Sequence, residues 1–235
     1  MHMHAAAALW LAGGLVTGMA LTASAQPAPN TLTAEERAAG WRLLFDGTTT
    51  AGWRGFRQQA MPDGWQVVDG ALTRVGKGGD IVTTEEFGDF DLSFEWQIGP
   101  GGNSGVFFGV SEQSTAVWHA APEYQILDNA GHKDGATPAT STGANYALHA
   151  PARDVARPAG QWNQSRITVQ GPRVTHWLNG EKIVEYEIGS PDWTARVAAS
   201  KFKAHPAYGT VRPGRIALQD HGDRVAFRSI RIRAR

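Results

Sequence analysis

Apolar and polar positions alternate with a period of two along most of the chain after residue 40, in short runs separated by turn-forming residues. The clearest run is Phe90 to Ile98, where every second side chain is apolar and those between are polar. Successive side chains of a strand point to opposite faces, so this run predicts a strand with one core face and one polar face. Repeated runs of this kind predict an all-β domain, a sandwich of two antiparallel sheets.

Two consecutive hairpins are predicted late in the chain. Ser165 to Val169 turns at Gly171-Pro172 into Val174 to Leu178, and Asn179-Gly180 leads that strand into Lys182 to Tyr186. Asn-Gly between alternating runs favours a type I′ turn, because both residues tolerate a positive φ.

Two further elements depart from plain alternation. The final strand, Val225 to Arg233, changes the phase of its apolar positions, which predicts a bulge near Arg228-Ser229. Thr33 to Ala39 has a Thr cap with Glu36 three residues on, a capping box that predicts a short helix.

The first 25 residues predict export. An apolar run over residues 5–21 is followed by Thr22-Ala23-Ser24-Ala25, a small-residue cleavage pattern typical of a signal peptide. We therefore expect a signal peptide at 1–25, a linker and short helix at 26–40, and one jelly-roll catalytic domain at 41–235. The chain has no cysteine, so disulfides and a lipidated Cys are excluded, and a periplasmic or secreted bacterial protein is expected, free of the membrane after cleavage.

The charge balance of the chain indicates which kind of partner to expect. Twenty-two basic and twenty-two acidic residues cancel without a block of like charge, so the sequence predicts no nucleic-acid partner and an uncharged ligand, and is silent on oligomeric state. Nine Trp residues supply flat apolar rings that suit sugar rings as well as cores; core packing is the alternative for each.

The first candidate site is Glu123 to Asp128, with the spacing E-x-Q-x-x-D. Glu123 and Gln125 share one face of a regular strand, and Asp128 joins them only if a bulge shifts the phase by one residue. The spacing therefore predicts a bulged strand with three polar side chains on a concave face. The alternative is an exposed strand with incidental polar residues.

The second candidate is Gln219-Asp220-His221-Gly222, directly after the apolar run Arg215 to Leu218. An adjacent Asp-His can supply acid and base or ligate a metal; the alternative is a capped turn. No zinc motif such as H-E-x-x-H occurs, so no cofactor is assigned, and a Ca or Mg ion held by Glu123, Asp128 or Asp220 oxygens is the open alternative.

Weaker candidates lie elsewhere. Asn103 sits in the glycine-rich turn 101–105, His176 lies in a predicted strand, and Lys201 and Lys203 share one side of a loop. A tight turn, a strand residue without function and solvated charges are the respective alternatives. Three long segments are expected to be loops that rim a cleft, namely 112–122, 129–143 and 190–213.

Five motifs occur in order along residues 41–232. They are Trp41-Arg42-Leu43-Leu44-Phe45-Asp46-Gly47, Asn103-Ser104-Gly105-Val106-Phe107-Phe108, Glu123-Tyr124-Gln125-Ile126-Leu127-Asp128, His176-Trp177-Leu178-Asn179-Gly180 and Gly214-Arg215-Ile216-Ala217-Leu218-Gln219-Asp220-His221-Gly222. Together they resemble the 3-keto-disaccharide hydrolase family, formerly a domain of unknown function. The resemblance implies a concanavalin-like jelly roll, usually exported, that cleaves glycosides already oxidised at C3.

The resemblance implies an elimination, since a ketone at C3 makes the C2 hydrogen acidic and water can then add to the enone. Such a route needs a base at C2, an electrophile or cation at the C3 oxygen and an acid at the glycosidic oxygen. The mapped roles are base for Glu123 or Asp128, acid or cation binding for His221 with Asp220, and substrate binding for Asn103, Gln125, Tyr146, His176, Lys201, Lys203 and Gln219. A lectin-like sugar-binding module and an ordinary glucan hydrolase are the competing classes.

Overall fold

The computed structural model describes residues 1–2 and 28–235, so most of the expected signal peptide at 1–25 lies outside the described residues. Within the described part of the chain, no helix is long and apolar enough to cross a membrane. The larger sheet of the sandwich has the strand order β11-β10-β9-β6-β13-β4-β3, with β1 paired to β13. The smaller sheet has the order β2-β5-β12-β7-β8, and all the pairings in both sheets are antiparallel.

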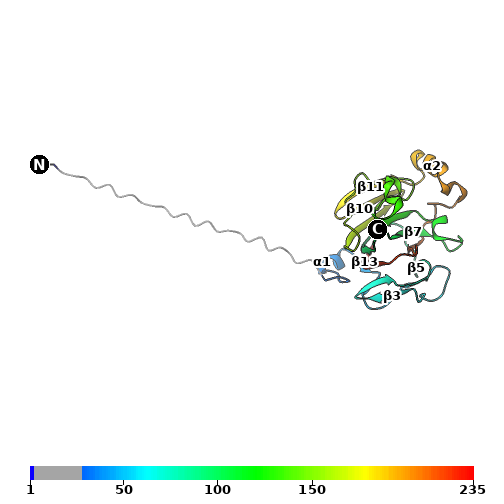
Figure 1. Ribbon diagram of the computed structural model, residues 1–235, viewed down its shortest axis with the longest axis horizontal. Helices are drawn as coiled ribbons and strands as arrows, with labels where there is room; N and C mark the ends of the chain where they lie inside the picture. The colour runs from blue at the N-terminus through cyan, green and yellow to red at the C-terminus, as the bar shows by residue number, and fades with distance from the viewer. Residues whose placement is uncertain (3–27) are drawn as a thin grey trace.

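The chain passes repeatedly from one sheet to the other, which gives the jelly-roll sandwich seen in Figure 1 and confirms the expected fold class. The strands of the larger sheet are β1 Arg42–Leu43, β3 Trp65–Val68, β4 Ala71–Arg74, β6 Phe90–Ile98, β9 Asn163–Gln170, β10 Arg173–Leu178, β11 Glu181–Glu187 and β13 Val225–Ala234. Those of the smaller sheet are β2 Trp53–Gly55, β5 Ile81–Thr83, β7 Asn103–Val110, β8 Glu123–Leu127 and β12 Arg215–Leu218.

The helical elements are short and lie outside the two sheets. They are α1 Ala34–Ala38, α2 Pro191–Ala198 and the 3-10 turns η1 Val117–His119, η2 Lys133–Ala136, η3 Pro138–Thr140 and η4 Lys201–Ala204. The capping box of α1 is confirmed, with Glu36 N donating to Thr33 Oγ1 and Thr33 N donating to Glu36 Oε2. Helix α2 was expected to be loop; it begins at Pro191 behind a Ser190 cap, a local start signal.

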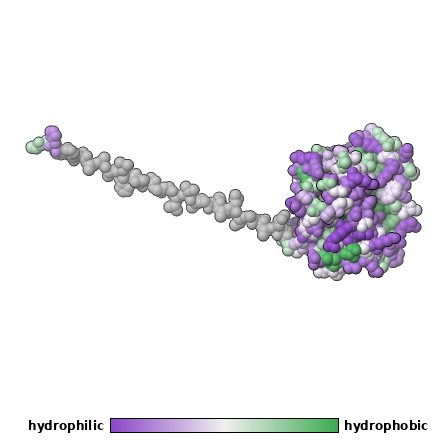
Figure 2. Space-filling view, in the orientation of Figure 1, coloured by the Kyte–Doolittle hydropathy of each residue, from purple (hydrophilic) through white to green (hydrophobic). Residues whose placement is uncertain are grey.

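The core lies between the sheets and follows the predicted alternation. The apolar side chains of β6 are all buried in it, from Phe90 to Ile98. On the viewed face of the surface, polar side chains predominate and apolar ones form only small patches (Figure 2).

Both predicted hairpins are confirmed. Strands β9, β10 and β11 pair in sequence, and the Asn179-Gly180 turn between the last two has φ values of 49° and 88°. Positive φ at both positions is the type I′ geometry that the Asn-Gly pair predicted.

The bulge predicted in the last strand is also confirmed. The pairing of β13 with β6 shifts register between Arg228 and Arg231, with Ser229 at a φ of 51°. Asn30 fixes the bulge, because Ser229 N donates to Asn30 Oδ1 while Asn30 N donates to Ser229 Oγ. The segment expected to be a linker is therefore bonded to the sheet from Asn30 onward.

The bulge predicted in the 123–128 segment is wrong. Strand β8 pairs with β7 in unbroken register from Phe107↔Glu123 to Asn103↔Leu127. Asp128 follows the strand end and caps the next turn, accepting from Gly101 N at 2.8 Å and Ala130 N at 3.2 Å. These bonds, one within its own turn and one to the turn before β7, hold the Asp128 side chain outside the strand without a bulge.

Candidate active site

The site is built on the outer face of the smaller sheet. In β8, Tyr124 and Ile126 point into the core between the sheets, so Glu123 and Gln125 point to the opposite face. The same face carries a small apolar cluster of Val82, Phe107, Val110, Val117, Ala121 and Ala217 beside Trp118. The outer face therefore has an apolar end and a polar end.

A pocket opens over the polar end and brings together residues from six separate parts of the chain. Glu123 and Gln125 come from β8, Asn103 begins β7, and Gln219 and His221 follow β12. The complete lining is Asn103, Trp118, Glu123, Gln125, Tyr146, Lys201, Gln219 and His221. Glu123 and His221 thus meet in one pocket although 98 positions separate them in the sequence.

Glu123 forms the acid of the pocket floor. Its side chain lies over Gly105, where an added Cβ atom would come within 2.9 Å of Glu123 Cγ and would overlap Oε1. Burial raises the pKa of Glu123 to about 8, although the Lys201 ammonium opposes this and the Asp80 carboxylate adds to it. The residue is only 6% exposed, and burial disfavours its charged form.

Three amide side chains surround this acid with oxygens that lack a hydrogen-bond partner in the described part of the chain. The atoms are Asn103 Oδ1, Gln125 Oε1 and Gln219 Oε1. The amide nitrogen of Gln125 donates to Thr140 O at 3.2 Å, which leaves its oxygen for the pocket. Because an unpaired buried acceptor is costly, these oxygens are suited to hydroxyl groups of a bound ligand.

Lys201 is held in place by aromatic rings. Its Nζ lies 4.9 Å from the ring centroid of Trp118, 4.7 Å from that of Tyr146 and 5.3 Å from that of Phe202. Such cation–π contacts fix an ammonium group without neutralising it. The arrangement places a positive charge at the pocket beside Glu123.

A column of stacked rings anchors the segment that carries Lys201. It runs from the His149 loop through β11 and α2 to η4, with neighbouring rings inclined by 10° to 14°. The rings are, in order, His149, Tyr186, Trp193, Tyr208 and Phe202. Helix α2, missed in the sequence, therefore supplies part of the support for the pocket.

Trp118 belongs to the segment 112–122, one of the three that were expected to rim a cleft. Its ring meets the edges of His119 and His205, whose own rings stack at a centroid distance of 4.0 Å. The stacked pair joins this segment to the one that follows η4. Two of the three expected rim segments thus contribute to the pocket, through Trp118 and Lys201.

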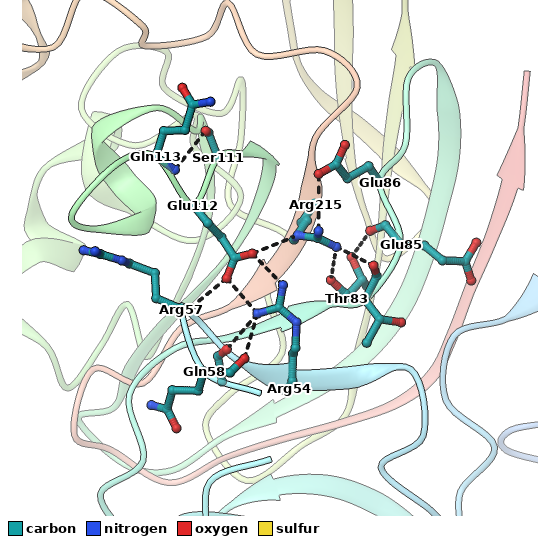
Figure 3. A network of polar contacts seen from close by, with 12 residues as sticks. Arg54, Arg57, Gln58, Thr83, Glu85, Glu86, Ser111, Glu112, Gln113 and Arg215 are labelled. Carbon is teal, nitrogen blue, oxygen red and sulfur yellow. Dashed lines mark hydrogen bonds and ion pairs between the residues drawn. The ribbon is translucent and has the colours of Figure 1, made fainter. Parts of the chain in front are cut away.

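The start of the Trp118 segment is fixed by a charged network (Figure 3). The Arg54 guanidinium binds both carboxylate oxygens of Glu112, at 2.7 and 2.5 Å, and Arg57 N donates to Glu112 Oε1 at 2.7 Å. Arg215 Nε lies 3.3 Å from Glu112 Oε2. The hydrogen bond from Arg54 is the largest cause that lowers the pKa of Glu112 to about 2. The network joins β2 and β12 to Glu112, two residues after the end of β7.

The structure does not bring two of the predicted acids to the pocket lining. Asp128 caps its turn, as described above. The Asp220 carboxylate accepts from Arg74 Nε at 2.7 Å, from Gly78 N and Gly79 N at 2.9 Å, and from Gly222 N at 3.0 Å. Burial raises the pKa of Asp220, but these bonds outweigh it and the net pKa is lowered. Both acids stabilise turns through fixed bonds.

His176 and Lys203 also lie outside the pocket lining. His176 is fully buried, its Nδ1 bonds Gly143 O at 2.9 Å, and burial lowers its pKa to about 4. Lys203 is exposed on η4, two residues beyond Lys201. The other predicted substrate-binding residues line the pocket, namely Asn103, Gln125, Tyr146, Lys201 and Gln219.

Two residues in or beside the pocket were not predicted from the sequence. Trp118 lies on the 3-10 turn η1, and nothing in the sequence distinguishes it from the other eight tryptophans. Asp80 precedes β5 and carries a pKa of about 6, raised mainly by burial. The pattern in the sequence that could have indicated Asp80 is an acidic residue directly before the short apolar run 81–83.

Metal ligands are sparse in the described residues, which contain no group of three or more His, Cys, Asp or Glu side chains placed to hold an ion. The pocket offers one carboxylate, three amide oxygens and one imidazole, with an ammonium group beside them. Carboxylate and amide oxygens accept hydrogen bonds from hydroxyl groups and are also ligands of hard cations, so the donor set is compatible with both.

Fold and site together define a jelly-roll sandwich with a polar ligand pocket on the outer face of its smaller sheet. The chain belongs to the family of the 3-keto-alpha-glucoside-1,2-lyase-like domain, which it matches over residues 40–233. This match confirms the resemblance identified from the five motifs.

Individual proteins that are similar to this chain support the same family assignment. A 3-keto-disaccharide hydrolase of Bacteroides thetaiotaomicron is 32% identical over 228 residues, covering 83% of this chain and 79% of that protein. A crystal structure of a candidate glycosyl hydrolase from Parabacteroides distasonis is 37% identical, with a TM-score of 0.84 over 88% of this chain and 100% of that one. The carbohydrate-binding module CBM66 of Bacillus subtilis, at 10% identity and a TM-score of 0.50 over 78% of this chain and 96% of that one, shares the fold alone.

Proposed function

We propose that this protein cleaves the glycosidic bond of 3-keto-disaccharides by elimination followed by hydration. The observation that carries the proposal is that, in a chain of this family, a buried carboxyl group shares one pocket with a fixed ammonium group and three unpaired amide oxygens. The relative from B. thetaiotaomicron bears the corresponding name.

The reaction needs proton transfer and charge stabilisation rather than two acids around an oxocarbenium ion. A base removes the C2 proton, and the electron pair of the C–H bond forms an enolate with the C3 oxygen. The enolate expels the C1 substituent, which takes a proton and leaves as an alcohol. Water then adds to C1 of the enone and a proton returns to C2, so the sum is hydrolysis.

We assign Glu123 as the base, since burial gives its carboxylate the higher basicity that abstraction beside a ketone demands. Lys201 stabilises the enolate oxygen, because its ammonium group is held by the rings of Trp118 and Tyr146 close enough to Glu123 to lower the pKa of that acid. His221 protonates the leaving oxygen. Asn103, Gln125 and Gln219 bind sugar hydroxyls, and Trp118 and Tyr146 offer rings to the sugar faces.

The test uses a 3-keto-sugar and two acid-to-amide variants. Wild-type protein is mixed with 3-keto-trehalose or 3-keto-sucrose, and release of the free sugar is followed. Glu123→Gln should fold normally and lose turnover by more than about 100-fold, the scale of a lost general base. Asp128→Asn, an equally conservative change in the other candidate base, should retain most of the activity; the reverse pattern would exclude Glu123 as the base.

Two further outcomes separate the alternatives. Binding of the 3-keto-sugar without turnover would make the protein a lectin-like module, and turnover of unoxidised laminarin would make it an ordinary glucan hydrolase. Repeating the assay with EDTA tests the cation alternative: loss of activity that Ca²⁺ or Mg²⁺ restores would assign a metal to the reaction.

We also propose export to the periplasm or medium, on the sequence pattern of residues 1–25. The N-terminus of the mature protein, read by mass spectrometry after expression in the bacterium, should be Gln26. An intact Met1 in the recovered protein would contradict this.

A further inference from the structure

Asp80 is a half-buried acid beside the pocket that the proposed reaction leaves without a role. It directly precedes β5, where Ile81 pairs with Leu218 and Val82 with Ala217. Because Val82 belongs to the apolar cluster of the outer face, Asp80, two residues earlier, has its side chain on that face too.

The register places Asp80 in one row with residues of the pocket. One step beyond the Ile81↔Leu218 pair, Asp80 lies opposite Gln219, and Gln219 N donates to Gly105 O at 3.0 Å. Gly105 in turn pairs with Gln125. The row across the sheet is therefore Gln125, Gly105, Gln219 and Asp80, and the Glu123 side chain lies over its glycine.

Asp80 also bonds the segment that carries two pocket residues. Its Oδ1 accepts from Asp220 N at 2.9 Å, and Asp220 stands between Gln219 and His221. The backbone of Asp80 is fixed from the other side, because Phe56 N donates to its carbonyl at 2.8 Å. Because both its carboxylate and its backbone carbonyl accept hydrogen bonds, Asp80 has a defined position relative to the pocket.

We propose that Asp80 is a positioning residue of the reaction, which holds the Gln219–His221 segment through Asp220 N and directs its negative charge along the row toward Glu123. The proposal rests on the assignment of Glu123 as the base. A negative charge opposite a carboxyl group makes that group harder to ionise and its carboxylate a stronger base. Asp80 would therefore act on the C2 proton through Glu123.

Other titratable groups lie near Glu123 and Asp80 and also affect their pKa values. Glu123 is faced by Lys201 from η4, by His221 from the segment after β12, and by Tyr146 and Tyr208, whose pKa values are raised by burial and by Glu123. Asp80 is faced by Asp220, which is itself paired with Arg74. These groups are unchanged in the variants below.

The test separates the charge of Asp80 from its hydrogen bond. Asp80→Asn keeps an oxygen for Asp220 N and removes the charge, whereas Asp80→Glu keeps the charge. In the pH profile of kcat/KM for a 3-keto-disaccharide, the rising limb near pH 8 should move down by about one pH unit in Asp80→Asn, the scale of a partly screened charge pair. It should stay in place in Asp80→Glu and in the control Asp128→Asn.

An unshifted limb in Asp80→Asn would overturn the proposal. Should that variant fail to fold, Asp80→Ser, neutral and smaller, provides the same test. A second readout does not need turnover: the free energy of unfolding is measured against pH for the wild type, Asp80→Asn, Glu123→Gln and the double variant. The loss of stability above pH 6 that depends on Glu123 should be smaller in the Asp80→Asn background, and an equal loss would refute the coupling even if no 3-keto-sugar is cleaved.

Discussion

The carboxyl group of Glu123 occupies the space that a side chain at Gly105 would need. The two residues lie on neighbouring strands, β8 and β7, and an added Cβ at Gly105 would come within 2.9 Å of Glu123 Cγ. A glycine is thus required here for close approach rather than for a turn. The position of the Glu123 side chain in the pocket therefore depends on the absence of a side chain at residue 105.

Gly105→Ala should therefore displace Glu123 while preserving the fold. We expect kcat/KM to fall by about 100-fold, the typical effect of a 1 Å misplacement, and stability to fall by roughly 1–3 kcal/mol from overpacking. Gly88→Ala is the matched control, because an added Cβ there meets nothing within 4 Å. Activity of Gly105→Ala equal to that of the control would show that the position of Glu123 is not limiting.

Lys201 and Lys203 offer a paired test of the ammonium group. Both lie on η4, but only Lys201 lines the pocket and contacts the aromatic rings. Lys201→Met removes the charge that lowers the pKa of Glu123, so the rising limb of the pH–rate profile should move to higher pH and kcat should fall. Lys203→Met should leave both quantities unchanged, and equal effects of the two variants would contradict the assignment.

The buried Glu123 should also make stability depend on pH. Its folded pKa of about 8 exceeds the ordinary value of 4.5, so its contribution to stability is complete below about pH 4.5 and is lost as pH rises through 8. Between pH 5 and pH 9, the free energy of unfolding of the wild type should fall by roughly 4 kcal/mol relative to that of Glu123→Gln. Urea unfolding at the two pH values measures it; a constant difference would mean that Glu123 titrates normally.

The Glu112 network predicts the opposite dependence. The pKa of Glu112 is lowered to about 2, mainly by Arg54, so its contribution is present above pH 4.5 and lost as pH falls toward 2. Glu112→Gln should cost roughly 1–3 kcal/mol at pH 7, because it leaves the part-buried Arg54 without its charged partner. The exposed pair Arg173–Glu187 is the control, and Glu187→Gln should cost less than about 1 kcal/mol. Equal costs for both variants would argue against the network.

The sequence alone determined the elements of this protein and much of the candidate site. Alternation along 90–98, the Asn179-Gly180 turn, the phase change near Ser229 and the Thr33 capping box each depend on interactions within a few residues, so a local pattern specifies them. The five motifs likewise identified the family.

Only the tertiary structure decided which polar residues meet. Strand pairing places Gln219 beside Gly105 and brings Asp80 into their row, and loop packing adds Trp118 and Lys201. It also separates acids that look alike in sequence: Glu123 is buried in a pocket, whereas Asp128 and Asp220 are bonded to turns. The physical reason is that burial, partner choice and pKa depend on contacts between strands far apart in the chain, which no local spacing records.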